Sequence, residues 1–139
     1  LNGNALTTLD VGIFDSLTSV GDLYLNGNAL TTLPAGIFDS LAGSRLSRLY
    51  LHDNELTTLP AGIFDPLSSR LSTLHLNINE LTTLPDGIFE SLTRLSTLDL
   101  TGNALECMPS VSMAACESFF PGETCTPNEP SVDGGVDEC

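Results

Sequence analysis

One phrase recurs along the chain at a nearly constant interval. Its form is N-x-L-T-T-L-P-A/D-G-I-F-D/E-x-L, and it returns four times with little change. The asparagines of these repeats, including a fifth after the last full phrase, lie 24, 26, 25 and 24 residues apart: Asn4, Asn28, Asn54, Asn79 and Asn103. A period of this length predicts a solenoid, in which each repeat is one coil that buries its apolar face only against neighbouring coils.

The repeat that begins at residue 71 shows how one coil is expected to fold. Alternation of apolar and polar residues predicts a short strand, with Leu74 and Leu76 pointing inward and their neighbours Thr73, His75 and Asn77 outward. Successive coils place these strands side by side in a parallel sheet. We expect the amide of Asn79 to bond backbone groups left unpaired by the turn, so that the equivalent asparagines form a ladder.

One phenylalanine in each coil is expected to close the core on the side opposite the strand. These side chains should stack as a column of Phe14, Phe38, Phe64 and Phe89. The coil length varies slightly, because two residues are added before Leu46 and one before Leu71. Such insertions are expected to bulge from the edge of a coil without breaking the core.

The combined pattern L-x-x-L-x-L-x-x-N-x-L and L-P-x-G-I-F-x-x-L resembles the leucine-rich repeat of the typical 24-residue class. The repeats are similar to those of variable lymphocyte receptors and of secreted algal and protist proteins. The run from Asn103 to Pro109 differs from the receptor cap, because it lacks a tryptophan and a Cys-x-Cys pair. The resemblance implies an α/β-type solenoid, a right-handed arc with a parallel sheet on its concave side and a convex side that is mostly irregular or briefly helical.

The repeats divide the chain into two parts. Residues 1–105 are expected to form a partial first coil and further coils that start at residues 20, 46, 71 and 95. The first coil begins in mid-repeat, so we expect upstream residues or another chain to cover that end. Residues 106–139 are expected to form an acidic cap and tail that contains all the cysteines: Cys107, Cys116, Cys125 and Cys139.

Four clustered cysteines indicate two disulfides and an oxidising compartment, which predicts an extracellular or cell-surface protein. Three pairings are open; sequence neighbours, Cys107 with Cys116 and Cys125 with Cys139, are weakly favoured. The cysteine spacing lacks C-x-x-C and a nearby histidine, so we expect no zinc site. Asp133, Asp137 and Glu138 do not match a calcium loop, which favours a solvated acidic tail and no metal.

Composition argues against several classes of function. The formal net charge is −14, which repels the phosphate backbone of nucleic acids. No apolar run approaches the roughly 20 residues that span a bilayer. Neither histidine lies in a motif with a nucleophile, and no glycine-rich phosphate loop is present. We therefore expect no enzyme activity and no cofactor.

The outward strand positions form three columns across the coils. The first reads Tyr24, Tyr50, His75 and Asp99, the second Asp22, Arg48, Thr73 and Thr97, and the third Asn26, His52, Asn77 and Thr101. Flat, amphipathic side chains in line anchor interfaces, whereas the alternative is a set of ordinary exposed strand residues. The residues expected to bind a protein or a glycan are Tyr24, Asn26, Arg48, Tyr50, His52, Thr73, His75, Asn77 and Asp99.

A second regular surface lies on one flank. It consists of the paired threonines Thr7-Thr8, Thr31-Thr32, Thr57-Thr58 and Thr82-Thr83. Packing between neighbouring coils explains such a ladder, and a docking or ice-binding surface is the alternative. Two functional hypotheses follow: a recognition or adhesion module that binds through the concave face, and a structural subunit of an extracellular assembly docked through its flank or its uncapped end.

Overall fold

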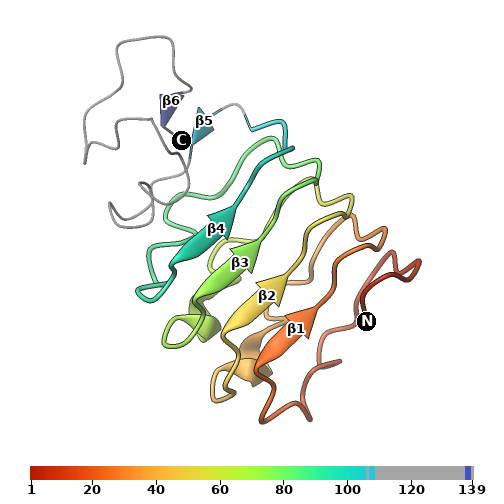
Figure 1. Ribbon diagram of the computed structural model, residues 1–139, viewed down its shortest axis with the longest axis vertical. Coiled ribbons are helices and arrows are strands. Elements are labelled where there is room, and N and C mark those ends of the chain that lie inside the picture. The colour runs from red at the N-terminus through yellow and green to blue at the C-terminus, as the bar shows by residue number, and fades with distance from the viewer. Residues whose placement is uncertain (106, 109–136, 139) are drawn as a thin grey trace.

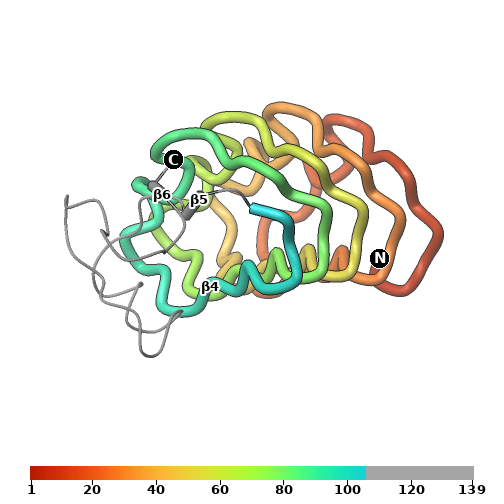
Figure 2. The backbone as a smooth tube through the Cα atoms, turned by 90° about the horizontal axis from the view of Figure 1, so that it is seen from above, coloured from red at the N-terminus to blue at the C-terminus, as the bar shows by residue number. Residues whose placement is uncertain are grey.

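A computed structural model describes residues 1–105 and the backbone of two later segments, residues 107–108 and 137–138. Four strands of three residues each form one parallel sheet in chain order: β1 (Asp22–Tyr24), β2 (Arg48–Tyr50), β3 (Thr73–His75) and β4 (Thr97–Asp99). They lie side by side in Figure 1, with one strand in each of the coils that start at residues 20, 46, 71 and 95. Seen from above, the coils follow one another in an arc whose inner side carries the strands (Figure 2). The predicted solenoid is confirmed.

The register of the sheet repeats from strand to strand. Leu23, Leu49, Leu74 and Leu98 are direct partners along it, as are the residues on either side of each leucine. Backbone bonds continue past the strands; for example, the amide of Leu51 donates to the carbonyl of His75 at 2.8 Å. Each coil is therefore joined to the next along the strand and the turn that follows it.

The core contains one stack of leucines beneath the sheet and one stack of phenylalanines behind it. The leucines predicted to point inward are all buried: Leu23, Leu25, Leu49, Leu51, Leu74, Leu76, Leu98 and Leu100. The rings of Phe14, Phe38, Phe64 and Phe89 follow one another with centroids 6.2, 6.3 and 6.1 Å apart. The predicted strand phase is confirmed, since a slip of one residue would have reversed every side chain.

The return path of each coil is short and mostly irregular. Two single-turn 3-10 helices lie there, η1 (Asp39–Leu41) and η2 (Asp65–Leu67), and each buries its leucine. The insertion after η1 bulges as predicted at Ala42 and Gly43, which are exposed, but Ser44 turns inward. Its hydroxyl oxygen accepts a hydrogen bond from the amide of Leu46 at 3.2 Å, which keeps that buried oxygen paired.

The exposure of the first column differs in part from the prediction. Tyr24 is exposed as expected, but Tyr50, His75 and Asp99 are half-buried. The reason is lateral packing, because neighbouring coils press the outward side chains of adjacent strands against one another. Period-2 alternation shows which face a side chain is on and does not show how far its neighbours cover it.

The last described elements follow β4 in the chain. β5 (Cys107–Met108) pairs in parallel with β6 (Asp137–Glu138). The four cysteine side chains, and with them the predicted disulfides and cap, lie outside the described residues. Within the part of the chain that the structure describes, no helix is long and apolar enough to cross a membrane.

From Asn28 on, each turn asparagine bonds to its own coil and to the coil before it. Asn54 is 8% exposed, and its Oδ1 accepts a hydrogen bond from the amide of Leu30 at 3.2 Å. Its Nδ2 donates to the carbonyls of Leu25, at 3.1 Å, and Leu51, at 3.0 Å. The equivalent three contacts recur at Asn28, Asn79 and Asn103.

Replacing Asn54 tests this network. Asn54→Ala leaves the amide of Leu30 without a partner and removes one of the two asparagine donors from the carbonyls of Leu25 and Leu51, so the free energy of unfolding should fall by about 1–3 kcal/mol. Asn4→Ala is the matched control, because Asn4 is exposed and bonds only to carbonyls of its own turn. Urea unfolding of the two variants measures the difference. Equal midpoints for Asn54→Ala and the unmodified chain would show that the asparagine bonds do not support the fold.

Candidate binding surface on the strand face

The strand face carries a continuous group of rings. Because β1 and β2 pair in register, Tyr24 stands directly beside Tyr50, and their rings stack 4.7 Å apart with an angle of 4° between planes. Tyr50 also meets the edge of His75 at 5.2 Å on the next strand. His52 contacts Tyr50 at 6.0 Å and His75 at 5.8 Å. These four residues, Tyr24, Tyr50, His52 and His75, are the aromatic cluster.

The aromatic cluster is a suitable contact surface for another protein. Stacked and edge-to-face rings hold each other in place, so little side-chain freedom is lost when a partner binds. Tyr24 remains 43% exposed at one end of the cluster. The rings therefore combine apolar area that is open to solvent with polar hydroxyl and imidazole groups.

The surroundings of His52 perturb its protonation. Burial lowers the pKa of His52 below its ordinary value of 6.5, and the nearby charge of His75 lowers it further. Asp53 and Asp99 act in the opposite direction and are outweighed. The Nδ1 atom of His52 is shielded from solvent and has no hydrogen-bond partner, so an added proton there would be poorly solvated.

The two neighbours of His52 in the third column show the same feature. The Oδ1 atoms of Asn26 and Asn77 are also shielded and without a hydrogen-bond partner. The column thus places three unpaired polar atoms on adjacent coils, at the border between the strands and the following turns. Sequence reasoning selected all three residues from their outward positions, but their shielding depends on side-chain packing and could not be derived from alternation.

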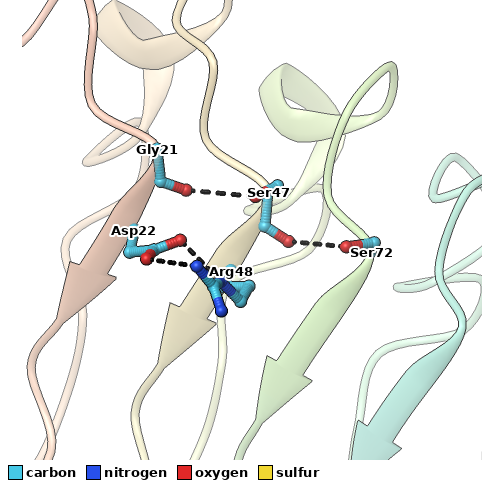
Figure 3. A network of polar contacts seen from close by, with 5 residues as sticks. All are labelled: Gly21, Asp22, Ser47, Arg48 and Ser72. Carbon is cyan, nitrogen blue, oxygen red and sulfur yellow. Dashed lines mark hydrogen bonds and ion pairs between the residues drawn. The ribbon is translucent and has the colours of Figure 1, made fainter.

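Charges at the start of the strands are already paired. Arg48 donates from Nε and Nη2 to the two carboxylate oxygens of Asp22, both at 2.7 Å (Figure 3). The hydrogen bonds and the negative charge of Asp22 raise the pKa of Arg48 above its ordinary value. The guanidinium side chain is 51% exposed, so water screens the pair and its contribution to stability is small. Arg48 is therefore engaged within the sheet.

A ladder of serine hydroxyls, which sequence reasoning missed, lies beside this ion pair. Ser47 Oγ donates to the carbonyl of Gly21 at 3.3 Å, and Ser72 Oγ donates to the carbonyl of Ser47 at 3.1 Å (Figure 3). Ser96 Oγ continues the series to Ser72 at 3.0 Å. The signal in the sequence was the recurrence of serine two residues before each strand leucine from the third coil on.

The remaining predicted residues fall into two groups. Thr73 and Asn77 lie on the strand face beside the aromatic cluster. Asp99 lies on β4, the last strand of the sheet, and accepts hydrogen bonds from the amide and the hydroxyl of Thr101 at 3.0 and 2.7 Å.

The paired threonines on the flank are all exposed, and a backbone hydrogen bond from the amide of Thr57 to the carbonyl of Thr31 joins two of the coils that carry them. Among the described residues, no group of three or more histidines, cysteines and acids is placed to hold a metal.

Comparisons with known proteins agree on one family. The family model of the leucine rich repeat matches residues 44–105 and 69–119, which together exceed half of the chain. The fold is similar to the crystal structure of the leucine-rich repeat domain of APL1B, with 30% sequence identity and a TM-score of 0.74. That match covers 86% of this chain and 35% of the other, so this chain spans about a third of its length. No curated protein matches the sequence.

The depressed pKa of His52 predicts a loss of stability in acid. Below the ordinary pKa of 6.5 the unfolded chain takes up a proton more readily than the folded chain, so stability falls as the pH drops toward the folded-state pKa. The variant His52→Asn carries the residue found at positions 26 and 77 of the same column. Between about pH 7.5 and about pH 5 its melting temperature should fall by fewer degrees than that of the unmodified chain. His52→Asn and the unmodified chain losing the same number of degrees would contradict this explanation.

Proposed function

This chain belongs to the leucine-rich repeat family, and we propose that it is a non-enzymatic recognition or adhesion module that binds a protein partner through its strand face. Leucine-rich repeat domains typically act as protein-binding modules. The observation that carries the proposal is the aromatic cluster, whose stacked rings span β1 to β3 and end at an exposed tyrosine.

Two features support a protein as the partner. Tyrosine is enriched among the few residues that dominate binding energy at protein interfaces, and Tyr50 lies at the centre of the cluster with three ring contacts. The surface is also preorganised, because its side chains are held by a regular sheet and need little rearrangement. The net charge of −14 argues against nucleic acid as the partner.

We propose an extracellular or cell-surface location. Four cysteines that cluster after the repeats are the support for this location, because disulfide-rich capping segments persist in oxidising compartments. The alternative function is a structural subunit docked through its flank. The eight exposed threonines on that flank favour it, since they form a regular polar surface that no described part of the chain covers.

Substitution of the central tyrosine tests strand-face binding. Tyr50→Ala should weaken binding of the captured partner by about 2 kcal/mol, roughly thirtyfold, because the central aromatic anchor is removed. The fold should lose only the stacking of the ring, about 0.5–1.5 kcal/mol. The measurement is titration calorimetry with the partner protein that a tagged chain captures.

A flank variant serves as the control. Thr58→Tyr places a bulky ring among the exposed threonines and leaves the strand face unchanged. Under the proposed function its affinity should equal that of the unmodified chain. Loss of binding with Thr58→Tyr, together with unchanged binding of Tyr50→Ala, would reject strand-face recognition and favour the structural subunit.

A further inference from the structure

The residue before each turn asparagine adopts a left-handed backbone conformation. These five residues have φ angles of 66°, 66°, 57°, 55° and 71°, and they are Gly3, Gly27, Asp53, Ile78 and Gly102. Glycine adopts this conformation without strain, and aspartate tolerates it better than most residues. For a β-branched residue it is an outlier, so Ile78 is the strained member of the row.

Ile78 is also exposed. Its relative accessibility is 57%, although its Cγ1 lies over the turn of the next coil, where a Cβ at Gly102 would be 3.4 Å away. Burial of an apolar side chain offsets strain in many proteins, but most of this side chain remains in water. The isoleucine is therefore unfavourable for the fold in two independent ways, at a position where three other coils use glycine.

The residues around Ile78 differ from the other coils as a group. Three turns carry the same triplet, Gly-Asn-Ala, at residues 3–5, 27–29 and 102–104. The two central coils carry Asp53-Asn54-Glu55 and Ile78-Asn79-Glu80 instead. Asp53, Glu55, Ile78 and Glu80 are all exposed, and we call them the acidic turn surface. Substitution of small neutral residues by one apolar and three charged ones is confined to adjacent coils.

The negative charge of the acidic turn surface is not balanced locally. Three of the four arginines of the chain, Arg45, Arg70 and Arg94, precede a strand, and Arg48 is the first residue of β2, whereas the turn residues follow a strand. Arg48 is in addition paired with Asp22 at 2.7 Å. Three carboxylates therefore lie on the same two adjacent turns as an exposed apolar side chain, at the end of the strands that lacks arginine.

The acidic turn surface continues the aromatic cluster. His52 is followed directly by Asp53, and His75 is two residues before Asn77, which precedes Ile78. The backbone also joins the two turns, since the amide of Asp53 donates to the carbonyl of Asn77 at 3.1 Å and that of Asn54 donates to the carbonyl of Ile78 at 3.2 Å. A partner lying across the cluster would reach Ile78 without crossing any other coil.

We propose that the acidic turn surface is part of the binding surface and takes a protein segment in which a large apolar side chain is flanked by arginine or lysine. This inference rests on the proposed function and names the chemistry of the partner. The apolar side chain covers Ile78, and the basic groups pair with Asp53, Glu55 and Glu80. Complementary charge selects such a segment over neutral or acidic ones and accelerates the encounter.

Replacement of Ile78 by glycine separates a role in binding from a role in folding. Ile78→Gly removes the strain, so its melting temperature should equal or exceed that of the unmodified chain by a few degrees. Val11→Ser is the control, because Val11 is another exposed apolar residue, at 67% relative accessibility, outside the acidic turn surface. A lower melting temperature for Ile78→Gly would show that the isoleucine serves the fold and would overturn the proposal.

Selection from a random peptide library displayed on phage provides the binding probe. The folded chain should enrich peptides with a leucine, isoleucine or phenylalanine flanked by arginine or lysine. Ile78→Gly should lower the affinity for the selected peptides roughly tenfold or more, as expected for loss of a buried apolar contact. The double variant Glu55→Gln, Glu80→Gln should lower the affinity for these peptides and make their binding less dependent on salt concentration. Val11→Ser should bind the peptides with the affinity of the unmodified chain.

Three results would overturn the proposal: no enriched peptide, enrichment of acidic peptides, or binding that Ile78→Gly leaves unchanged. Tyr50→Ala distinguishes this failure from failure of the proposed function. If only Tyr50→Ala lowers the affinity for the peptides, the role of the acidic turn surface is rejected and strand-face recognition is retained. Peptides that bind all variants equally would reject both.

Discussion

Each coil of this solenoid is closed by one asparagine amide. The chain reverses direction after every strand, and the reversal leaves an amide and two carbonyls inside the molecule that no backbone partner reaches. The side chain of Asn54 pairs with all three, one of them in its own coil and two in the preceding coil. The carbonyls also accept from the asparagines of the adjacent coils, and without this row of asparagines the amides and carbonyls would be buried without partners, at a cost of about 1–3 kcal/mol each. Coil closure and coil stacking are therefore one interaction.

Because closure is the same in every coil, the outward positions are free to vary. The buried side of the sheet is leucine throughout, and the back of the core repeats phenylalanine. The strand face, in contrast, changes from tyrosine to histidine to aspartate along its first column. A scaffold of constant interior that presents variable side chains at fixed spacing suits recognition, and the aromatic cluster and the acidic turn surface both lie among these variable positions.

The period of the sequence was sufficient to predict the strands, their register and both core columns. Each of these depends on which way a side chain points, and direction follows from alternation within a strand of fixed phase. The features that the period could not predict depend on contacts between neighbours. They are the partial burial of Tyr50 and His75, the hydrogen bonds that the hydroxyls of Ser47 and Ser72 donate, and the shielding of Nδ1 of His52. The left-handed conformation of Ile78 could have been found from the sequence, because it aligns with glycine in three other coils. The cysteine pairing lies in the part of the chain that the structure does not describe.

Hydrogen exchange of three backbone amides tests the role of the asparagines most directly. The amides of Leu30, Leu56 and Leu81 donate to the Oδ1 atoms of Asn54, Asn79 and Asn103 at 3.2, 3.1 and 3.1 Å. If closure and stacking are one interaction, these amides open only when the solenoid unfolds, and NMR should show all three exchanging with the slowest amides of the strands. Exchange of Leu30, Leu56 and Leu81 at the rate of an unstructured peptide would show that the coils stack without the asparagine bonds.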